Sequence, residues 1–236
     1  MSTLSPEASL VAYYAQRAQQ YERVYHKPER QDDLRRLREI VRTAIIGKRV
    51  LEVACGTGYW TELVAPVVEH LVGVDVNEEV LALARAKHVP AGKVTFRRGD
   101  AFDLPDLAGQ FNAALCGFWW SHVPKSRLIP FLRGLHRKLE PGALVLVFDN
   151  AYVGGSSTPL SRVDSDGNPV SCGDEEGNTY QQRVLDDGST HQIVKNFPTA
   201  HELHATVNGL GQNVKIQWLT YYWVLSYTVQ NGDCRE

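Results

Sequence analysis

Two glycines lie in a short turn that follows an apolar run, in the segment VLEVACGTGYW at residues 50–60. A glycine-rich turn between a strand and a helix lets backbone N–H groups approach a bound ligand closely. Loops that bind a dinucleotide pyrophosphate carry a third glycine three residues after the second, for close helix–strand packing. That position holds Thr61, so we expect Gly56, Thr57 and Gly58 to hold a different nucleotide-type ligand.

Two acids near this turn indicate the charge of the ligand. Glu52 lies in the apolar run, four residues before Gly56, and a carboxylate there would repel two phosphates but favour an ammonium or sulfonium group. Asp75 ends the next apolar run, nineteen residues after Gly56, where an acid can bond ribose hydroxyls. The sequence therefore favours a cationic nucleoside rather than a polyphosphate.

Candidate proton acceptors follow two later apolar runs. His122 lies in FWWSHVP at residues 118–124, and Asp149 ends VLVFDN together with Asn150. Either side chain could accept a proton from a hydroxyl group of a bound substrate, because the loops after these strands border the ligand crevice of an open α/β sheet. His122 could instead bond backbone and shape its loop.

Aromatic side chains surround these candidates in the sequence. We expect Trp119 and Trp120 either to line the binding site of a flat substrate or simply to pack against other side chains. Tyr14 and Tyr21 share one face of a predicted N-terminal helix, so both can contact a cationic ligand, with hydrophobic packing as the alternative. We expect Tyr13 and Tyr152 to lie beside the same substrate, and Tyr14 is a further candidate catalytic residue.

Alternating strands and helices must position these residues. Apolar runs that read as strands occupy residues 49–54, 70–76, 94–100, 111–118 and 141–150. Helical patterns separate them, which indicates a parallel sheet covered on both faces. Towards the end, two runs around Asp187-Gly188 predict a hairpin, Thr199 caps a helix, and two almost contiguous runs must form an antiparallel pair.

We expect a single domain over residues 1–236. Residues 1–47 form a helical lid or cap that begins with a helix over 5–26 started by Ser5-Pro6, and 48–150 form the ligand-binding core. Residues 151–198 form a loop and hairpin insertion, and 199–236 form the C-terminal helix and strand pair.

Composition restricts the partners. The formal net charge of the 236 residues is −2, so no nucleic-acid partner is expected, although an arginine-rich face at 30–42 leaves tRNA or rRNA open. No run is long enough to span a membrane, and the first ten residues lack the features of a secretory signal. Four cysteines without a CxxC pair favour a reducing, cytoplasmic location and disfavour a zinc site.

The motifs together resemble the class I S-adenosylmethionine-dependent methyltransferases. The resemblance rests on the Glu52-x-x-x-Gly56-x-Gly58 turn, on Asp75, on Gly99-Asp100-Ala101 and on the turn at 139–143. The segment from Tyr14 to Glu22 is similar to the lid of small-molecule members, including the ubiquinone/menaquinone and toxoflavin methyltransferase types. This implies an α/β fold with a Rossmann-like, seven-stranded, mostly parallel sheet, an antiparallel last strand, an N-terminal helical lid and a β-hairpin insertion.

The resemblance also implies the roles of individual residues. The cofactor would be S-adenosyl-L-methionine, and its product S-adenosyl-L-homocysteine. The glycines and Thr57 would approach the methionine portion, with Glu52 supporting its ammonium group through backbone or water and Asp75 with Val76 taking the ribose. Asp100 would accept a hydrogen bond from the adenine amino group, or merely cap a turn. Further cofactor contacts would come from Ala101, Phe102, Phe118, Tyr14 and Tyr21.

The predicted activity is methyl transfer to nitrogen, or to oxygen, of a small aromatic or heterocyclic metabolite. A hydroxyl or carboxyl acceptor served by His122 or Asp149 is one alternative, and a non-catalytic S-adenosylmethionine-binding protein is another. Metal-dependent catechol-type members carry an Asp-Asn pair where Asp149 and Asn150 stand, but they also need an Asp where Phe118 and Trp119 stand, so no metal is expected. The expected assembly is a monomer or a homodimer.

Overall fold

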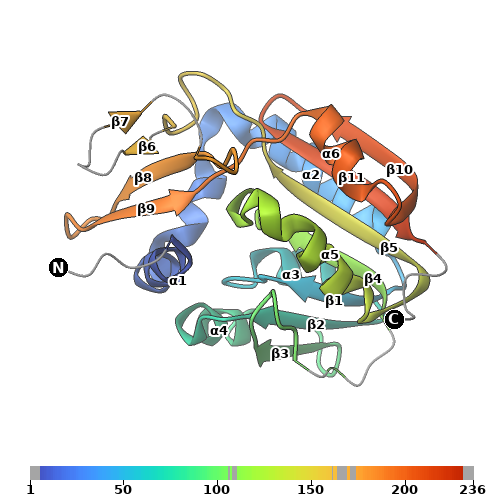
Figure 1. The fold of residues 1–236 in the computed structure, drawn as a ribbon. Coiled ribbons are helices and arrows are strands. Elements are labelled where there is room, and N and C mark those ends of the chain that lie inside the picture. The colour runs from blue at the N-terminus through green and yellow to red at the C-terminus, as the bar shows by residue number, and fades with distance from the viewer. Residues whose placement is uncertain are drawn as a thin grey trace.

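The computed structural model describes residues 6–105, 107, 111–160, 162–163, 169–170 and 174–230. Seven strands form its main sheet, in the order β10-β11-β5-β4-β1-β2-β3 (Figure 1). They are β1 (Arg49–Val53), β2 (His70–Asp75), β3 (Val94–Arg98), β4 (Phe111–Gly117), β5 (Leu139–Asn150), β10 (Gly211–Trp218) and β11 (Tyr222–Val229). Five strands run parallel, while β11 lies antiparallel to both β5 and β10. The expected Rossmann-like sheet with its antiparallel end is confirmed.

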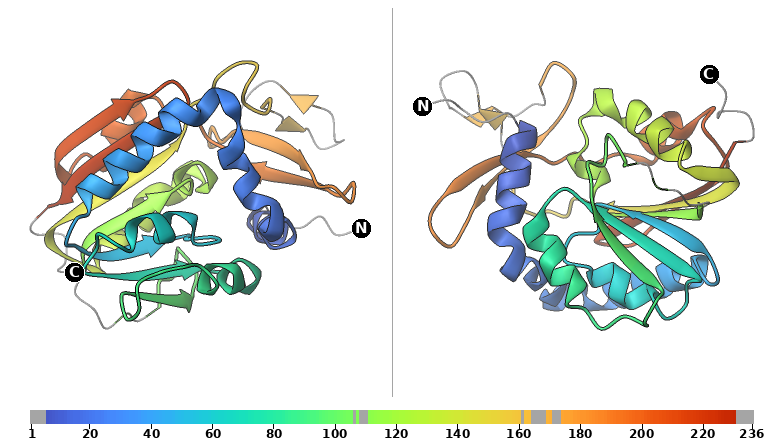
Figure 2. Two further views of the ribbon diagram at one scale, coloured as in Figure 1. Left: turned by 180° about the vertical axis from the view of Figure 1, so that it is seen from behind. Right: turned by 90° about the horizontal axis from the view of Figure 1, so that it is seen from below.

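Helices cover both faces of this sheet, as the opposite views in Figures 1 and 2 show. The helices α5 (Leu128–His136) and α6 (Ala200–Val207) pack on one face, and α2 (Gln31–Ala44) and α3 (Tyr59–Val64) pack on the other. A separate apolar core lies on each side, because the central strands are buried on both faces. The helix α4 (Glu78–Arg85) follows β2 and lies against β3 and the N-terminal segment.

The N-terminal segment differs from the single helix expected over 5–26. The α-helix α1 (Pro6–Arg17) ends at Arg17, and the tighter 3₁₀ segments Ala18–His26 and Pro28–Arg30 follow; Ser5 lies outside the described residues. Two surfaces explain the break. Leu10 and Tyr13 of α1 pack against Ile193, whereas Tyr25 packs into the core beneath α2. One straight helix could not reach both places, so the chain rewinds and turns between them.

The predicted hairpin is present and lies beside α1 (Figure 1). Strands β8 (Tyr180–Val184) and β9 (Thr190–Val194) pair antiparallel around Gly188, whose φ is +82°. Two-residue strands β6 (Arg162–Val163) and β7 (Pro169–Val170) form a further small sheet. Thr199 begins α6 with a capping box, as its sequence position indicates. Within the described ranges, no helix has both the length and the apolar character that a membrane span requires.

Candidate active site

The turn after β1 requires unusual backbone conformations. Ala54, Gly56 and Gly58 all have positive φ, at 54°, 55° and 76°. Gly58 also lies close to α4, because a Cβ atom at this position would sit 3.0 Å from the Cβ atom of Ala84. Gly56 lines a cavity, whereas Gly58 is not among the lining residues. Gly58 is therefore explained by its conformation and by the close approach of α4 rather than by direct ligand contact.

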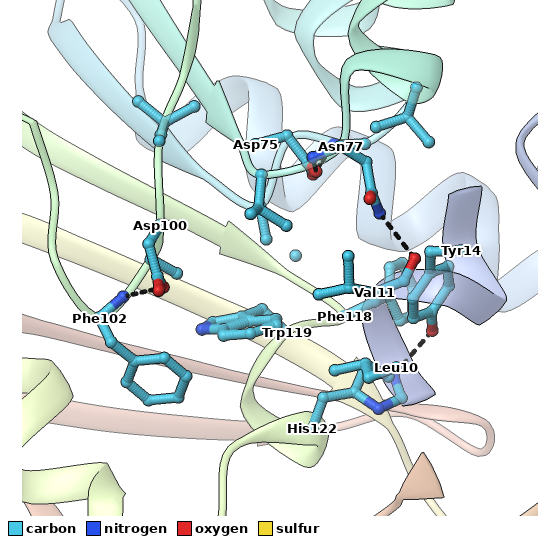
Figure 3. Close-up of a pocket in the computed structure, with 18 of the residues that line it drawn as sticks. Leu10, Val11, Tyr14, Asp75, Asn77, Asp100, Phe102, Phe118, Trp119 and His122 are labelled. Carbon is cyan, nitrogen blue, oxygen red and sulfur yellow. Dashed lines mark hydrogen bonds between the residues drawn. The ribbon is translucent and has the colours of Figure 1, made fainter. Parts of the chain in front are cut away.

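Asp75, at the carboxyl end of β2, fastens this turn. Its Oδ2 atom accepts a hydrogen bond from the backbone N–H of Gly56 at 2.9 Å, and its Oδ1 atom accepts one from the N–H of Asn77 at 2.9 Å. Burial raises the pKa of the Asp75 carboxyl, and these backbone donors oppose the shift. The side chain borders the cavity beside Asn77, where Figure 3 shows both.

Glu52 does not reach the ligand cavity. It lies beneath the turn, 3% exposed, and its Oε2 atom accepts a hydrogen bond from the Thr61 hydroxyl at 2.5 Å. Burial raises its pKa to about 8, and the nearby Asp75 carboxylate adds to the shift. The sequence-based expectation of an ionised Glu52 facing a cationic ligand therefore needs correction: in this structure the carboxyl is buried and holds its proton at neutral pH.

The first cavity has an empty volume of about 1030 Å³ and lies over the carboxyl ends of β1, β2, β3 and β4. At one end, the rings of Phe102 and Trp119 meet edge to face at 5.7 Å (Figure 3). The Arg127 guanidinium stacks over Phe102 at 3.5 Å. Asp100 Oδ1 accepts from the Phe102 N–H at 2.9 Å, so this acid caps its own turn. The expected cofactor residues that line the cavity are Gly56, Thr57, Asp75, Val76, Asp100, Ala101, Phe102, Phe118, Tyr14 and Tyr21.

His122 and Tyr14 form a hydrogen-bonded pair between α1 and the loop after β4. The Tyr14 hydroxyl lies 2.8 Å from Nε2 of His122, and Nδ1 of His122 lies 2.8 Å from the Val194 carbonyl oxygen. A carbonyl only accepts, so Nδ1 carries the imidazole proton and Nε2 accepts from Tyr14. Burial lowers the pKa of His122 to about 3, and the Lys195 ammonium contributes to the lowering. The imidazole is neutral, and its lone pair is already occupied.

Asp149 is fully buried and paired, which is a correction to its expected role as an accessible base. It accepts hydrogen bonds from the Ser121 N–H at 2.9 Å and from Nζ of Lys195 at 3.2 Å. Burial alone would raise its pKa, but the Lys195 ammonium and the hydrogen bonds from Ser121 together with other neighbours outweigh burial and hold it below its ordinary value. Sequence reasoning missed Lys195, because nothing in the HQIVKN segment shows that the lysine points inwards.

A second cavity, with an empty volume of about 720 Å³, adjoins the first. Four side chains line both, namely Tyr14, Tyr21, Phe118 and His122. Phe118 follows β4 with a φ of +58°, a conformation that few bulky residues adopt. The remaining lining residues come from the N-terminal segment, the end of β5 and the region after it, the β8–β9 hairpin with the residues that follow it, and β11. They are Arg17, Val24, Tyr25, Lys27, Arg30, Asn150, Ser156, Ser157, Thr158, Gln181, Arg183, Lys195, Phe197 and Tyr222.

None of the four expected acceptor residues lines the second cavity. Trp120 is buried in the core and meets Trp223 at 6.0 Å, because the 3₁₀ turn at 120–122 points it away from its neighbour Trp119. Tyr13 packs beneath the hairpin, and Tyr152 is 46% exposed against Phe197. Trp119 lines the first cavity rather than the second.

An ionic network fastens the N-terminal segment to the turn after β1. Glu22 accepts a hydrogen bond from the Thr57 hydroxyl at 2.8 Å and pairs with Nζ of Lys87 at 2.9 Å. Lys87 also lies 3.3 Å from Glu62 of α3. These charged neighbours raise the pKa of Lys87 against the effect of burial. Sequence reasoning missed this contact, since its partners lie 35 and 65 positions apart.

No group of three or more potential His, Cys, Asp or Glu metal ligands occurs in the described part of the chain. Asp149 directs one oxygen to an ammonium group, and Asn150 Oδ1 accepts from Arg30 at 3.0 Å. The side chains of Asp149 and Asn150, the pair that corresponds to metal ligands in catechol-type members, thus both contact cationic groups, and this arrangement disfavours a divalent cation.

Comparison with known proteins finds a methyltransferase domain within the chain. Residues 50–142 match the family described as a methyltransferase domain. A 2-phytyl-1,4-naphtoquinone methyltransferase of Synechococcus elongatus is 37% identical over 109 residues, covering 44% of this chain and 46% of the relative. A ubiquinone biosynthesis O-methyltransferase of Pseudomonas aeruginosa is 32% identical over 108 residues, covering 45% and 46%. The match thus spans less than half the length of these curated relatives.

Solved structures extend the likeness to the whole fold. DhpI in complex with SAH superposes with a TM-score of 0.76 at 24% identity, over 98% of this chain and 100% of DhpI. A complex of DhpI with SAM and HEP gives a TM-score of 0.75. Residues 50–142 therefore carry the sequence pattern of a methyltransferase domain, and the described part of the chain has the fold of these solved structures.

Proposed function

We propose that the chain transfers a methyl group from S-adenosylmethionine to nitrogen or oxygen of a small molecule. The observation that carries this proposal is the pair of cavities that meet at Tyr14, Tyr21, Phe118 and His122. One cavity suits a nucleoside and the other has room for an acceptor, so donor and acceptor can meet where the cavities join.

The first cavity has the chemistry that the cofactor requires. The Asp75 carboxylate stands at the end of β2, where it can accept hydrogen bonds from ribose hydroxyls. Phe102 and Trp119 supply aromatic surfaces for the adenine ring, beside Asp100. Glu52 would act from below the turn rather than by contact with the amino acid portion. When bound, the cofactor supplies a methyl group already activated by its sulfonium.

The residues at the junction orient the reactants and exclude water. Burial raises the pKa of Tyr21 to about 12, so its phenol stays neutral and can donate a hydrogen bond. The rings of Tyr14 and Tyr21 meet edge to face at 5.6 Å and close one side of the junction. Aromatic faces there can also stabilise a neighbouring cationic methyl group.

The geometry favours an acceptor that needs no base. The lone pair of His122 is occupied by Tyr14, and Asp149 is buried beside Lys195. A neutral hydroxyl would need one of them to remove its proton, whereas a nitrogen lone pair or an oxygen that is already anionic would not. This argument disfavours the alternative in which His122 or Asp149 serves a hydroxyl. The second cavity also favours an enzyme over a protein that only binds the cofactor.

The relatives support a small-molecule acceptor. The curated relatives are named as methyltransferases of quinone biosynthesis, and the DhpI complex holds HEP together with SAM. An aromatic or heterocyclic acceptor, a monomeric or homodimeric state, the absence of a nucleic-acid partner and a cytoplasmic location stay predictions.

Two measurements test the proposal. Calorimetry should detect binding of S-adenosylhomocysteine to the wild-type chain, and Phe102→Ala should weaken it because one aromatic surface of the first cavity is lost. Ile129→Ala, a change of an exposed side chain on α5, is the matched control and should leave binding unchanged. Absence of binding by the wild type would refute the proposed function. The second measurement is turnover, followed as the S-adenosylhomocysteine that forms when the chain is incubated with S-adenosylmethionine and mixtures of small acceptors.

A further inference from the structure

The wall of the second cavity carries an unusual charge distribution. Among the residues that the structure describes, five cationic side chains and no carboxylate line it. We call them the cation cluster: Arg17, Lys27, Arg30, Arg183 and Lys195. They come from the N-terminal segment and from the β8–β9 hairpin with the residue after it, regions far apart in the sequence.

Neutral groups hold most of this cluster in place. Arg30 donates to Asn150 Oδ1 at 3.0 Å and to the Ser156 hydroxyl at 2.9 Å, and Lys27 donates to the Ser156 carbonyl oxygen at 2.8 Å. Arg17 donates to the Tyr13 hydroxyl at 2.5 Å. These bonds fix the side chains but leave their positive charges uncompensated.

Arg183 is the member with unused hydrogen-bonding capacity. Its Nη1 donates to the Thr158 hydroxyl at 2.9 Å, and its Nη2 donates to Gln181 Oε1 at 2.6 Å. Its buried Nε has no hydrogen-bond partner within the described ranges. A buried donor without a partner is costly, so a ligand atom that accepts from it would be favoured.

Two carboxylates lie near the cluster, and they offset only part of its charge. Asp149 pairs with Lys195 from behind the wall, and Glu29 accepts from the Ser156 hydroxyl at 2.9 Å on the exposed side. No ion pair between Arg17, Arg30 or Arg183 and a carboxylate occurs among the residues that the structure describes. At least three guanidinium charges therefore face a half-enclosed space, where the dielectric constant is lower than in water and charges interact more strongly.

The cations also disfavour one another, and an anion would relieve this. The pKa of Lys195 is lowered by burial and then by Arg183 and Arg30, although Asp149 opposes the shift. The pKa of Lys27 is lowered by burial and by Arg30. Burial is the main cause of both shifts, and the neighbouring guanidinium groups add to them; the five clustered cations would repel a protonated amine and attract an oxyanion.

We propose that the acceptor carries an oxyanion, a carboxylate or a phosphoryl group, that the cation cluster binds and orients. This inference rests on the proposed function and names the substrate class of the second cavity. Planar guanidinium groups match carboxylate and phosphoryl oxygens well, since they offer two parallel donors. The oxyanion would accept from Arg183 Nε and balance Arg30 and Arg17, while the rest of the acceptor extends towards Phe118 and Tyr21.

Four probes with one common ring test this inference. Phenylphosphonate, benzoate, benzamide and benzylamine are titrated by calorimetry into protein saturated with S-adenosylhomocysteine. We expect at least one anion to bind about tenfold or more tightly than benzamide, because charge-assisted hydrogen bonds replace neutral ones. Benzylamine should bind most weakly. The better of the two anions shows whether the site prefers a phosphoryl group or a carboxylate.

Variants locate the interaction. Arg183→Gln and Arg17→Gln should each weaken binding of the preferred anion about tenfold and leave the affinity for S-adenosylhomocysteine within twofold. Arg35→Gln removes an exposed charge on α2, where Arg35 pairs with Asp32, and should change neither. Retained cofactor-product binding also shows that the variants fold.

The contrary results are distinct. Equal affinity for benzoate and benzamide, no binding of either anion, or unchanged anion binding in both variants would overturn the oxyanion proposal while the proposed function stands. Failure of the wild type to bind S-adenosylhomocysteine would instead refute the proposed function itself.

Discussion

Glu52 makes the stability of the fold depend on pH in an unusual direction. Burial beneath the turn after β1 raises the pKa of its carboxyl to about 8, whereas an unfolded chain has an ordinary glutamate pKa of 4.5. Between these values the folded protein keeps the proton and the unfolded chain releases it. The folded state then binds more protons than the unfolded state, so the free energy of unfolding falls as the pH rises.

The expected size follows from the pKa difference. Each pH unit well inside the window changes the free energy of unfolding by about 1.4 kcal/mol, so the Glu52 contribution falls by about 3 kcal/mol between pH 5 and pH 7.5. The side chain at position 52 in the Glu52→Gln variant cannot ionise, so the free energy of unfolding of the variant lacks this dependence on pH. Its carbonyl can still accept from the Thr61 hydroxyl, although its amide places additional donors in a buried site.

Urea denaturation at several pH values measures the effect. The free energy of unfolding of Glu52→Gln minus that of the wild type should increase by about 3 kcal/mol from pH 5 to pH 7.5. Using the change of this difference with pH removes the fixed cost of the buried amide. Glu39→Gln, an exposed position on α2, is the control and should show no such trend. Parallel curves for wild type and Glu52→Gln would refute the reasoning, since they would mean that Glu52 ionises normally in the folded protein.

Four further predictions concern the site. Asp75→Ala should weaken S-adenosylhomocysteine binding by about 1–3 kcal/mol in calorimetry, and unchanged affinity would exclude a ribose contact. The same ligand should slow amide hydrogen exchange over residues 6–26, and less so in Lys87→Met, which breaks the link to Glu22; equal exchange with and without ligand would identify a fixed scaffold. Turnover should persist in EDTA, whereas loss restored by Mg²⁺ would establish a metal. His122→Ala should reduce turnover without abolishing it, and with a pKa of about 3 the wild-type His122 should produce no inflection in the rate near pH 6.5.

The sheet and the first cavity were predictable because their signals are local. Each parallel strand is a short apolar run, and the turn at Gly56 and Asp75 at the end of β2 stand at fixed positions relative to those runs. The carboxyl ends of neighbouring parallel strands meet at one edge, so residues there come together whatever the distant packing.

The second cavity was not predictable in the same way. Arg17 and Arg183 line the second cavity only because the hairpin folds back onto α1. Their sequence surroundings resemble those of ordinary surface arginines. Adjacent Trp119 and Trp120 look alike in the sequence, yet a 3₁₀ turn sends one to the first cavity and the other to the core. Glu52 was placed correctly in its strand, but its protonation depends on burial that the sequence does not display.

The attachment of α1 to the hairpin has a kinetic consequence. Tyr13 packs against β9, and Tyr14 on the same helix lines both cavities and bonds to His122. A displacement of α1 that admits the donor must therefore also disturb the wall around the acceptor. If the donor enters by such a displacement, exchange at the two sites depends on one opening event, and donor and acceptor are enclosed together in a ternary complex. Steady-state rates should then give the intersecting reciprocal plots of a sequential mechanism, with the departure of both products governed by the same opening.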